Sequence, residues 1–441
     1  MEEALVSYGT LNSEFLLLGL PTWCLMQGSF GILYKLVDTQ PEGFDISTYV
    51  MTSLTLGNIF ALYFGNTHQK LLYEKSVEVI ACLLVAGLLT GIGLAICWWW
   101  TINGTSFPLF VLMFCGGLVS ATSNIALFTF VFSPRFLNHK VPGCTAHGEA
   151  TALNTQGPAG RTTALATGMA LGSGFSGLLA LTQGQIALST PNNSASVSDG
   201  SGFSVSVFFC ILSALYGVAL YALFLLWRRG HNRKSSYDDN EKARNDVSGP
   251  LLGPSDDDVN LNIYGGGTPV VEALSTTELQ LMALLVFTGM MGFGVVPSVI
   301  SGVCGKFRHG SNTGLLFATC IACVGDPFSR ALTSWVYLQT LSQLVAMATL
   351  CAALTAALLV LFALPGNSEV FGGLDGAALP ASLYVAFTFC FGFLNTSAFV
   401  YINHGDSADK QRLSRLASMA MQAGAFCGAV VMFIFVITDV L

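Results

Sequence analysis

The sequence predicts an all-α protein that crosses a membrane many times. Of its 441 residues, 53% are hydrophobic and only 10% are charged, and the mean hydropathy is +0.64. A soluble domain carries roughly 25% charged residues, so most of this chain is expected to lie in lipid. Backbone groups in lipid must bond to one another, which leaves helices or a closed barrel. The apolar runs are too long for barrel strands of about 10 alternating residues, so the spans are predicted to be helices.

Eleven segments are apolar over the length of roughly 20 residues that a membrane-spanning helix needs. The division between the eighth and ninth is the least defined, because no strong helix breaker lies between Tyr337 and Leu344. The first segment follows Glu2 and Glu3 and no basic residue, so it is predicted to be a retained span and not a cleaved signal. The segments lie near residues 14–36, 47–65, 76–100, 107–133, 160–183, 203–227, 279–301, 312–338, 340–363, 379–403 and 412–438.

Lys and Arg are concentrated in alternate loops of this arrangement. The loops after the second, fourth, sixth and tenth segments hold most of them, whereas the opposite side holds only Lys35, Lys306 and Arg308. The positive-inside rule therefore places the amino terminus in the cytoplasm and the carboxyl terminus outside. Two N-glycosylation sequons, at Asn103 and Asn192, fall in loops that this topology places outside. The sequons favour the plasma membrane as the location.

One polar segment divides the chain. Residues 230–278 are rich in Ser, Asp, Asn, Gly and Lys and include an acidic run at 256–258, which is the composition of a disordered linker. The topology places this linker in the cytoplasm. It separates an N-terminal bundle of six helices, over residues 1–229, from a C-terminal bundle of five helices, over residues 279–441.

Motifs of soluble enzymes and of nucleic-acid-binding proteins are not supported by their context. The run 172–177 fits G-x-G-x-x-G, but a dinucleotide site needs a preceding strand, and here the run lies within a span. Small residues at a helix interface explain it better. The 12 cysteines show neither a disulfide framework nor a metal spacing. The sequence has no stripe of basic residues that would indicate nucleic-acid binding. We therefore expect no enzyme activity, cofactor or metal.

A pair of charges lies in the eighth predicted span. Asp326 and Arg330 are four residues apart, so they share one face of a helix and can pair. A charge in the hydrocarbon core costs about 2.5–3.5 kcal/mol, and such residues usually pair and face the bundle interior or a wet cavity. Two interpretations are open. The pair is either a lock between two helices or a polar anchor for a solute that crosses the membrane.

Further polar and aromatic residues lie within the predicted spans of both halves. Each alone is more often a helix–helix hydrogen bond, worth about 0.6 kcal/mol. Together, their distribution is the one that a central site between two helical bundles requires. Amides and hydroxyls beside aromatic rings favour a neutral, flat, hydroxylated solute. The candidates are Trp23, Gln27, Asn58, Asn124, Ser298, Asn395 and Tyr401.

Several motifs resemble those of the eukaryotic riboflavin transporter family. The resemblance implies facilitative transport of riboflavin by alternating access, in an eleven-helix, six-plus-five bundle of the major-facilitator type. The most specific part is Pro-Glu-Gly-Phe at 41–44 followed by Leu-Gly-Asn at 56–58. The other matches are Gly-Leu-Pro-Thr-Trp at 19–23 with Gln27 and Gly28, Thr-Ser-Asn at 122–124, Gly-Val-Val-Pro-Ser at 294–298, and Tyr401.

The eighth span differs from that family and resembles another one. Asp326, Arg330 and Thr333 are similar to the Asp-x-x-x-Arg-x-x-Thr motif of equilibrative nucleoside transporters. That family shares the eleven-span topology, and its Asp and Arg help to form the sugar end of the nucleoside site. The alternative function is therefore equilibrative transport of nucleosides or nucleobases. A cell-surface receptor or scaffold without transport is a further class.

For riboflavin, mid-span position and family resemblance imply a role for each candidate. Trp23 is expected to stack on the ring system. Asp326 is expected to accept hydrogen bonds from sugar or ribityl hydroxyls, with Arg330 holding it ionised and oriented. The expected partners are the small solute and the lipid bilayer. The residues expected to bond to ring carbonyls or hydroxyls are Gln27, Asn58, Asn124 and Asn395.

Overall fold

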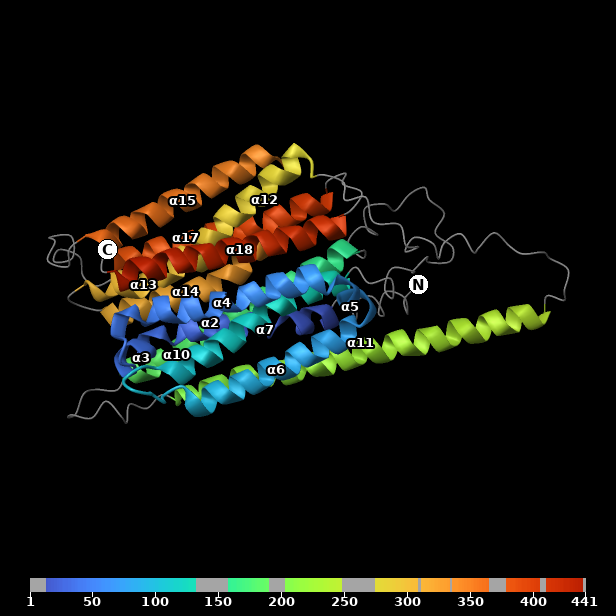
Figure 1. Cartoon of the computed structure of the whole chain (residues 1–441), viewed down its shortest axis with the longest axis horizontal. Coiled ribbons are helices and arrows are strands. Elements are labelled where there is room, and N and C mark those ends of the chain that lie inside the picture. Colours follow the sequence, from blue (N-terminus) through green and yellow to red (C-terminus); the bar gives the residue numbers. More distant parts are fainter. Residues whose placement is uncertain are drawn as a thin grey trace.

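The computed structural model describes residues 13–131, 158–189, 203–247, 274–307, 311–333, 335–364, 378–404 and 410–438. In these ranges the regular elements are helices, and extended pairing is limited to one isolated bridge between Ile102 and Thr105. The long helices lie side by side with similar axes (Figure 1). In the described part of the chain, nine helices are long and apolar enough to cross a membrane. The all-helical prediction is therefore confirmed.

The nine candidate spans correspond to the third to eleventh predicted segments. The third to sixth are α6 (Ser76–Cys97), α7 (Phe107–Val131), α10 (Pro158–Ser189) and α11 (Val205–Val247). The seventh runs from α12 (Thr276–Gly289) through η4 (Met290–Val295) to α13 (Val296–Gly305). The eighth to eleventh are α14 (Ser311–Leu332), α15 (Leu341–Ala363), α17 (Ala378–His404) and α18 (Lys410–Ile437).

The second predicted segment forms α4 (Ile46–Thr67), which has 22 residues. It is long enough to span, but it is not among the nine apolar candidates. The reason lies in its buried side, which carries many hydroxyl and amide groups. These are Ser47, Thr48, Thr52, Thr55 and Asn58.

The first predicted segment is an interrupted helix. Residues 13–19 are helical, residues 20–23 form a turn, and α2 (Cys24–Gly31) and α3 (Leu33–Thr39) follow. Pro21 explains the first break, because its ring removes a backbone donor and clashes with the preceding helical turn. The turn is closed by a bond from the Thr22 amide to the Gly19 carbonyl, at 3.1 Å.

The seventh span is also interrupted. Between α12 and α13 the backbone forms η4, a six-residue π-helix. Pro297 lies in the first turn of α13 and cannot donate to the regular helical ladder. The Ser298 hydroxyl beside it donates to the Gly294 carbonyl at 2.6 Å. π-Helical turns of this kind are rare and often mark functional sites.

The eighth span is shorter than predicted. α14 ends at Leu332 and not near residue 338, and α15 begins at Leu341. The start of α15 is a capping box: the Thr340 side chain accepts from the Gln343 amide, and the Gln343 side chain accepts from the Thr340 amide. This Thr-x-x-Gln pattern was visible in the sequence as a helix start.

The helix α11 continues beyond Arg229, the predicted end of the N-terminal bundle, to Val247. It projects from the bundle in Figure 1. From His231 to Val247 the sequence has no Gly or Pro to end the helix, whereas Gly249 and Pro250 follow. Residues 248–273 lie outside the described residues, as does the sequon at Asn192. Asn103 lies in the exposed turn between α6 and α7.

The run Gly-Ser-Gly-Phe-Ser-Gly at 172–177 serves helix packing, as predicted. A Cβ atom at Gly172 would lie 1.9 Å from the Leu20 carbonyl oxygen in the first span. A Cβ atom at Gly177 would lie 2.6 Å from the Cβ atom of Cys323 in α14. The absence of side chains thus lets α10 approach both the first and the eighth spans closely.

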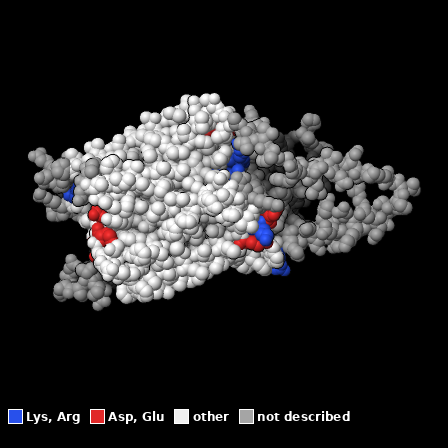
Figure 2. Space-filling view, in the orientation of Figure 1, with Lys and Arg blue, Asp and Glu red and all other residues white. Residues whose placement is uncertain are grey.

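The face of the molecule drawn in Figure 2 carries its charges at the two ends of the bundle. In the view of Figure 2 the Lys, Arg, Asp and Glu side chains gather at either end, and the wide band between them has none. Such a band is the surface that a protein presents to the hydrocarbon part of a bilayer. This charge distribution is the one expected if the long helices cross a membrane from one side to the other.

Candidate functional site

The breaks in the first and seventh spans meet in the middle of the bundle. The Trp23 ring, at the end of the first break, contacts the Phe293 ring of η4 edge-on, with centroids 5.5 Å apart and planes at 75°. Interrupted helices in corresponding positions of two halves are the strongest sequence-level pointer to a transporter binding site. Two adjoining cavities lie against these rings.

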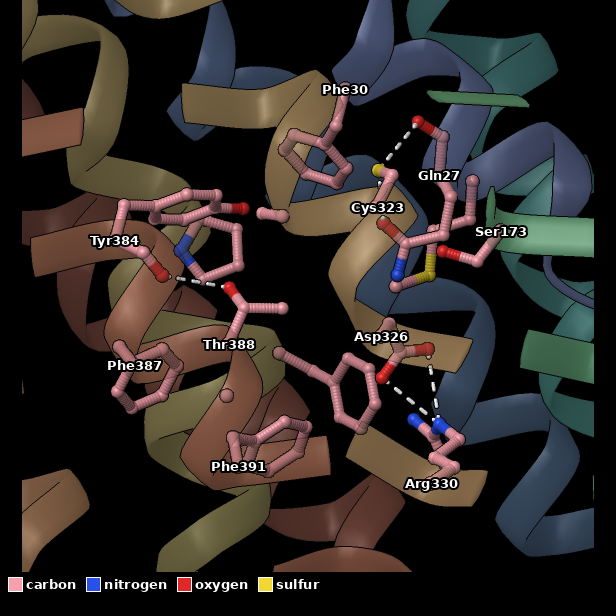
Figure 3. Close-up of a pocket in the computed structure, with 15 residues that line it drawn as sticks. Gln27, Phe30, Ser173, Cys323, Asp326, Arg330, Tyr384, Phe387, Thr388 and Phe391 are labelled. Carbon is pink, nitrogen blue, oxygen red and sulfur yellow. Dashed lines mark hydrogen bonds and ion pairs between the residues drawn. The ribbon is translucent and has the colours of Figure 1, made fainter. Parts of the chain in front are cut away.

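The larger of these, which we call the central cavity, lies among the first, fifth, seventh, eighth and tenth spans. Figure 3 shows two unlike sides: Tyr384, Phe387, Thr388 and Phe391 on one, and Gln27, Ser173, Cys323, Asp326 and Arg330 on the other. We call these the aromatic wall and the polar wall. The remaining lining residues are Met26, Phe30, Gly292, Phe293, Pro297 and Ala322.

The aromatic wall comes from a single helix face. Tyr384, Phe387, Thr388 and Phe391 recur at the spacing of helical turns along α17, so their side chains project in one direction. The Phe387 and Phe391 rings are stacked, with centroids 5.8 Å apart and planes at 9°. Phe391 also contacts Phe293 edge-on at 5.1 Å. The wall is therefore a packed set of rings that a flat solute can contact.

The ion pair forms the end of the polar wall. Arg330 Nε donates to both carboxylate oxygens of Asp326, at 2.9 and 3.0 Å. Both side chains are buried, with exposed fractions of 8% and 6%. The pair lies within α14 and does not itself join two helices. Gly392 of α17 faces it, and a Cβ atom there would lie 2.7 Å from Asp326 Oδ1.

Trp23 connects the ion pair to the broken first span. The guanidinium carbon of Arg330 lies 4.8 Å from the centroid of the Trp23 ring. A cation over an aromatic face is attracted by the ring quadrupole, by about 2 kcal/mol or more when both are desolvated. The opposite edge of the polar wall is formed by Gln27, whose Oε1 atom accepts from the Cys323 thiol at 3.5 Å.

A second cavity, which we call the lateral cavity, adjoins the central one. Both are lined by Met26 and Phe293, so these two side chains separate them. The Asn58 amide nitrogen at its edge donates to the Gln422 carbonyl at 3.5 Å. The other residues of its lining are Trp23, Met51, Leu54, Thr55, Gly117, Ser120 and Ala121.

The space in this conformation is small. The volume open to the centre of a water molecule is about 30 Å³ in the central cavity and about 20 Å³ in the lateral cavity. One water needs roughly 10–15 Å³ on this measure, so each cavity has room for only a few waters. A solute with several rings needs the walls to move apart, and the structure therefore shows the site in a contracted form.

Five of the predicted site residues line these cavities. Trp23 and Asn58 line the lateral cavity, and Gln27, Asp326 and Arg330 line the central one. Both oxygens of Asp326 accept from Arg330, whereas the terminal nitrogens of Arg330 carry the donors that this pairing leaves over.

The other four predicted residues line neither cavity. The Ser298 carbonyl accepts from the hydroxyls of Ser47 and Thr48, both at 2.8 Å. Asn124 donates from its amide to the Ser418 hydroxyl at 3.4 Å. These contacts join the N-terminal and C-terminal halves. Asn395 is buried, and Tyr401 is half-buried against the apolar core.

The residues that sequence reasoning missed are mainly the aromatic ones. Tyr384, Phe387 and Phe391 lie in a helix that is apolar on all sides, so no hydrophobic face distinguishes them from lipid-facing rings such as Phe389. The place of Phe293 in the lining could not be predicted, because the π-helix changes the direction in which its side chain points. A signal did exist for α17, since Tyr384, Phe387, Thr388 and Phe391 have the i, i+3, i+4, i+7 spacing.

The chemistry of the cavity is that of binding. Its lining offers rings, one amide, hydroxyls and one ion pair. In the described part of the chain, no group of three His, Cys, Asp or Glu side chains could hold a metal ion. A flat solute with polar atoms at one edge would contact both walls at once.

Comparison with known proteins identifies the family. A family model described as "Solute carrier family 52, riboflavin transporter" matches residues 13–440. The chain is 25% identical to "Riboflavin transporter rft-1" of Caenorhabditis elegans, over 89% of this chain and 88% of that one. It is also 25% identical to "Solute carrier family 52, riboflavin transporter, member 3" of Ailuropoda melanoleuca, over 94% of this chain and 93% of that one.

Among solved structures, the chain is similar to an auto-inhibited POT family peptide transporter. The TM-score is 0.54 at 12% identity, covering 98% of this chain and 90% of that one, so the likeness concerns the fold alone. The fold is thus that of a membrane carrier, and the match of a single family model runs through both halves and both broken spans. The chain belongs to solute carrier family 52, the riboflavin transporter family.

Proposed function

We propose that this chain carries riboflavin across a membrane by facilitative alternating access. The observation that supports it most is the central cavity, where two interrupted helices meet between an aromatic wall and a polar wall. The isoalloxazine ring of riboflavin is flat and carries polar atoms along one edge, so it matches this pair of walls. The names of the chain's relatives support the same substrate.

The arrangement proposed is an eleven-span bundle of the major-facilitator type, with six helices before residue 230 and five after residue 278. The broken first helix and α4 supply the two spans beyond the nine apolar candidates. The amino terminus is cytoplasmic, the carboxyl terminus is extracellular, and the membrane is the plasma membrane. Asn103 and Asn192 are the proposed glycosylation sites on the outer side.

Alternating access needs contacts between the halves that break and re-form. On the proposed outer side, Ser47 and Thr48 donate to the Ser298 carbonyl, and the Asn312 amide donates to Asp38 Oδ1 at 2.7 Å. On the proposed inner side, the Phe128 and Phe399 rings stack with centroids 5.5 Å apart. With both sides in contact, the contracted cavity represents a closed intermediate of the cycle.

The substrate contacts proposed are Gln27, Asp326 and Arg330 in the central cavity, and Trp23 and Asn58 when the two cavities join. Asn124, Ser298, Asn395 and Tyr401 stay candidates for contacts made in other conformations. The nucleoside alternative rests on the Asp326–Arg330–Thr333 spacing and on the shared eleven-span topology, and the family match does not favour it.

The test is uptake of labelled riboflavin and of labelled uridine into cells that express the chain at their surface. We expect saturable riboflavin uptake that flavin analogues inhibit, and no uridine uptake above that of control cells. Uridine uptake without riboflavin uptake would show that the nucleoside alternative is right. If neither solute enters, the receptor class replaces both transport functions.

A further inference from the structure

Arg330 has donors that the protein leaves unused. A guanidinium group carries five N–H donors, one on Nε and four on the terminal nitrogens. The Nε donor bonds to Asp326. Within the part of the chain that the structure describes, neither terminal nitrogen has a hydrogen-bond partner, although the side chain is only 8% exposed and lines the central cavity. These donors belong to a residue that lines the cavity, so a ligand there that supplies acceptors would be stabilised.

The orientation of this group is fixed from two sides. Asp326 holds Nε, and the Trp23 ring lies against the guanidinium at 4.8 Å. A guanidinium held in this way is a planar fork whose geometry matches two acceptor oxygens or one acceptor approached from two donors. It is preorganised, so little side-chain entropy is lost on binding.

The charge of the cavity argues for a neutral acceptor. Asp326 and Arg330 are the only Asp, Glu, Lys, Arg or His side chains among the residues that line the central cavity, and they pair with each other. The pair has no net charge with which to compensate a phosphate or carboxylate. A carbonyl oxygen is an acceptor without charge and without a proton of its own. A hydroxyl would bring a donor as well, and a guanidinium group has no acceptor for it.

We propose that the terminal nitrogens of Arg330 bind carbonyl oxygens on the pyrimidinedione edge of a flavin, and that this contact selects the ring and not the sugar-like chain. The aromatic wall, on the opposite side of the cavity, stacks on the rest of the ring system. Asp326 acts as a positioning residue that holds Nε. The inference rests on the proposed function, and it adds which part of the substrate the cavity recognises.

The experiment compares two rings of the same shape. Lumichrome has the three-ring system with two carbonyl oxygens and no ribityl chain, and a dimethylphenazine has the same outline without carbonyl oxygens. Equilibrium binding of each is measured to the purified full chain in detergent. We expect the wild type to prefer lumichrome by at least about tenfold, the ratio that one hydrogen bond to a charged group provides.

The variant Arg330→Gln is expected to bring this ratio to within about threefold, while affinity for the phenazine stays nearly the same. Arg330→Lys keeps the charge and loses the planar fork, and it is expected to reduce the preference too, which provides a second variant if the first does not fold. Phe391→Leu is the matched control. It lies in the aromatic wall, so it should weaken both ligands equally and leave the ratio unchanged.

The inference is overturned if the wild type shows no preference for lumichrome or does not bind it, or if folded Arg330→Gln keeps the full preference. These results are separate from the test of the proposed function. A wild type that prefers lumichrome but takes up no riboflavin contradicts transport and keeps the recognition site. Riboflavin uptake by a chain whose preference does not depend on Arg330 contradicts only the recognition site.

Discussion

Two ion pairs between a carboxylate and a guanidinium, both in the described part of the chain, have different surroundings. Asp326 and Arg330 lie one turn apart in α14, both more than nine-tenths buried, against the central cavity. Glu14 and Arg229 come from the first span and α11, with Nη1 and Oε1 3.0 Å apart, and Arg229 is 41% exposed. The second pair joins two helices at the end of the bundle, whereas the first lies within one helix.

The comparison shows that a charge in a span does not by itself mark a site. Glu14 is as well buried as Asp326, with exposed fractions of 5% and 6% for their side chains. What differs is the partner's position. Arg229 lies at the end of the apolar span of α11, while Arg330 lines a cavity whose opposite wall is made of rings. The Glu14–Arg229 pair is thus the lock between two helices, and the Asp326–Arg330 pair is the proposed anchor for a solute. Four variants can test this distinction.

The largest effect is expected from Asp326→Asn, which leaves the buried Arg330 charge without its partner. Breaking a buried pair on one side costs about 3–5 kcal/mol, so little folded protein should be recovered. The double variant Asp326→Asn/Arg330→Gln removes both charges and should recover folded protein at the cell surface without riboflavin uptake. Size-exclusion chromatography measures the first property and labelled uptake the second. Recovery of both by the double variant would show that the pair is only structural.

The next effect is expected from Gly392→Ala. The new Cβ atom would lie 2.2 Å from Ser329 Oγ and 2.7 Å from Asp326 Oδ1, so α17 and α14 must separate. Such overpacking costs about 1–3 kcal/mol, and we expect a lower melting temperature together with weaker riboflavin uptake. Gly217→Ala in α11 is the control, since a Cβ atom there meets no atom within 4 Å. Equal behaviour of the two variants would count against the close approach at the site.

A smaller effect is expected from Phe391→Leu in the aromatic wall. Loss of ring contacts worth about 0.5–1.5 kcal/mol should raise KM for riboflavin uptake roughly 2–12-fold. Phe389→Leu is the matched control on the same helix, because Phe389 is 40% exposed on the lipid-facing side. The KM of each variant is measured from riboflavin uptake at a series of concentrations. A control variant as impaired as Phe391→Leu would remove the distinction between the two faces of α17.

The smallest effect is expected from Arg229→Gln, which breaks the pair with Glu14. Pairs with an exposed partner contribute about 0.2–1 kcal/mol, so the melting temperature should fall slightly. Since Arg229 lines neither cavity, KM for riboflavin should stay within about twofold of wild type. A large rise in KM at normal surface expression would place this pair in the transport mechanism and weaken the contrast with Asp326 and Arg330.

Much of the fold could be predicted from the sequence because lipid imposes length and apolarity on each span. The break at Pro21 and the pairing of Asp326 with Arg330 also follow from local rules, namely a missing backbone donor and one helical turn of spacing. The π-helix before Pro297 does not, since it depends on how Gly292 and Gly294 pack against α17 and α18.

Only part of the candidate site could be predicted from the sequence, and the reason is different. Sequence position says where along a helix a polar residue lies, but not which neighbouring helix its side chain meets. Asn58 and Asn124 look alike in the sequence, yet Asn58 borders the lateral cavity and Asn124 bonds to Ser418 outside both cavities. The aromatic wall needed the structure, because rings facing lipid and rings facing a cavity have the same composition.

The most direct test of the account is a structure of the purified chain with riboflavin, determined by cryo-electron microscopy. The account predicts that the tricyclic ring lies between α14 and α17, stacked on Phe387 and Phe391, with the central and lateral cavities joined by movement of Met26 and Phe293. Density for riboflavin at another place, with Asp326 and Arg330 still enclosed in a contracted cavity, would contradict it.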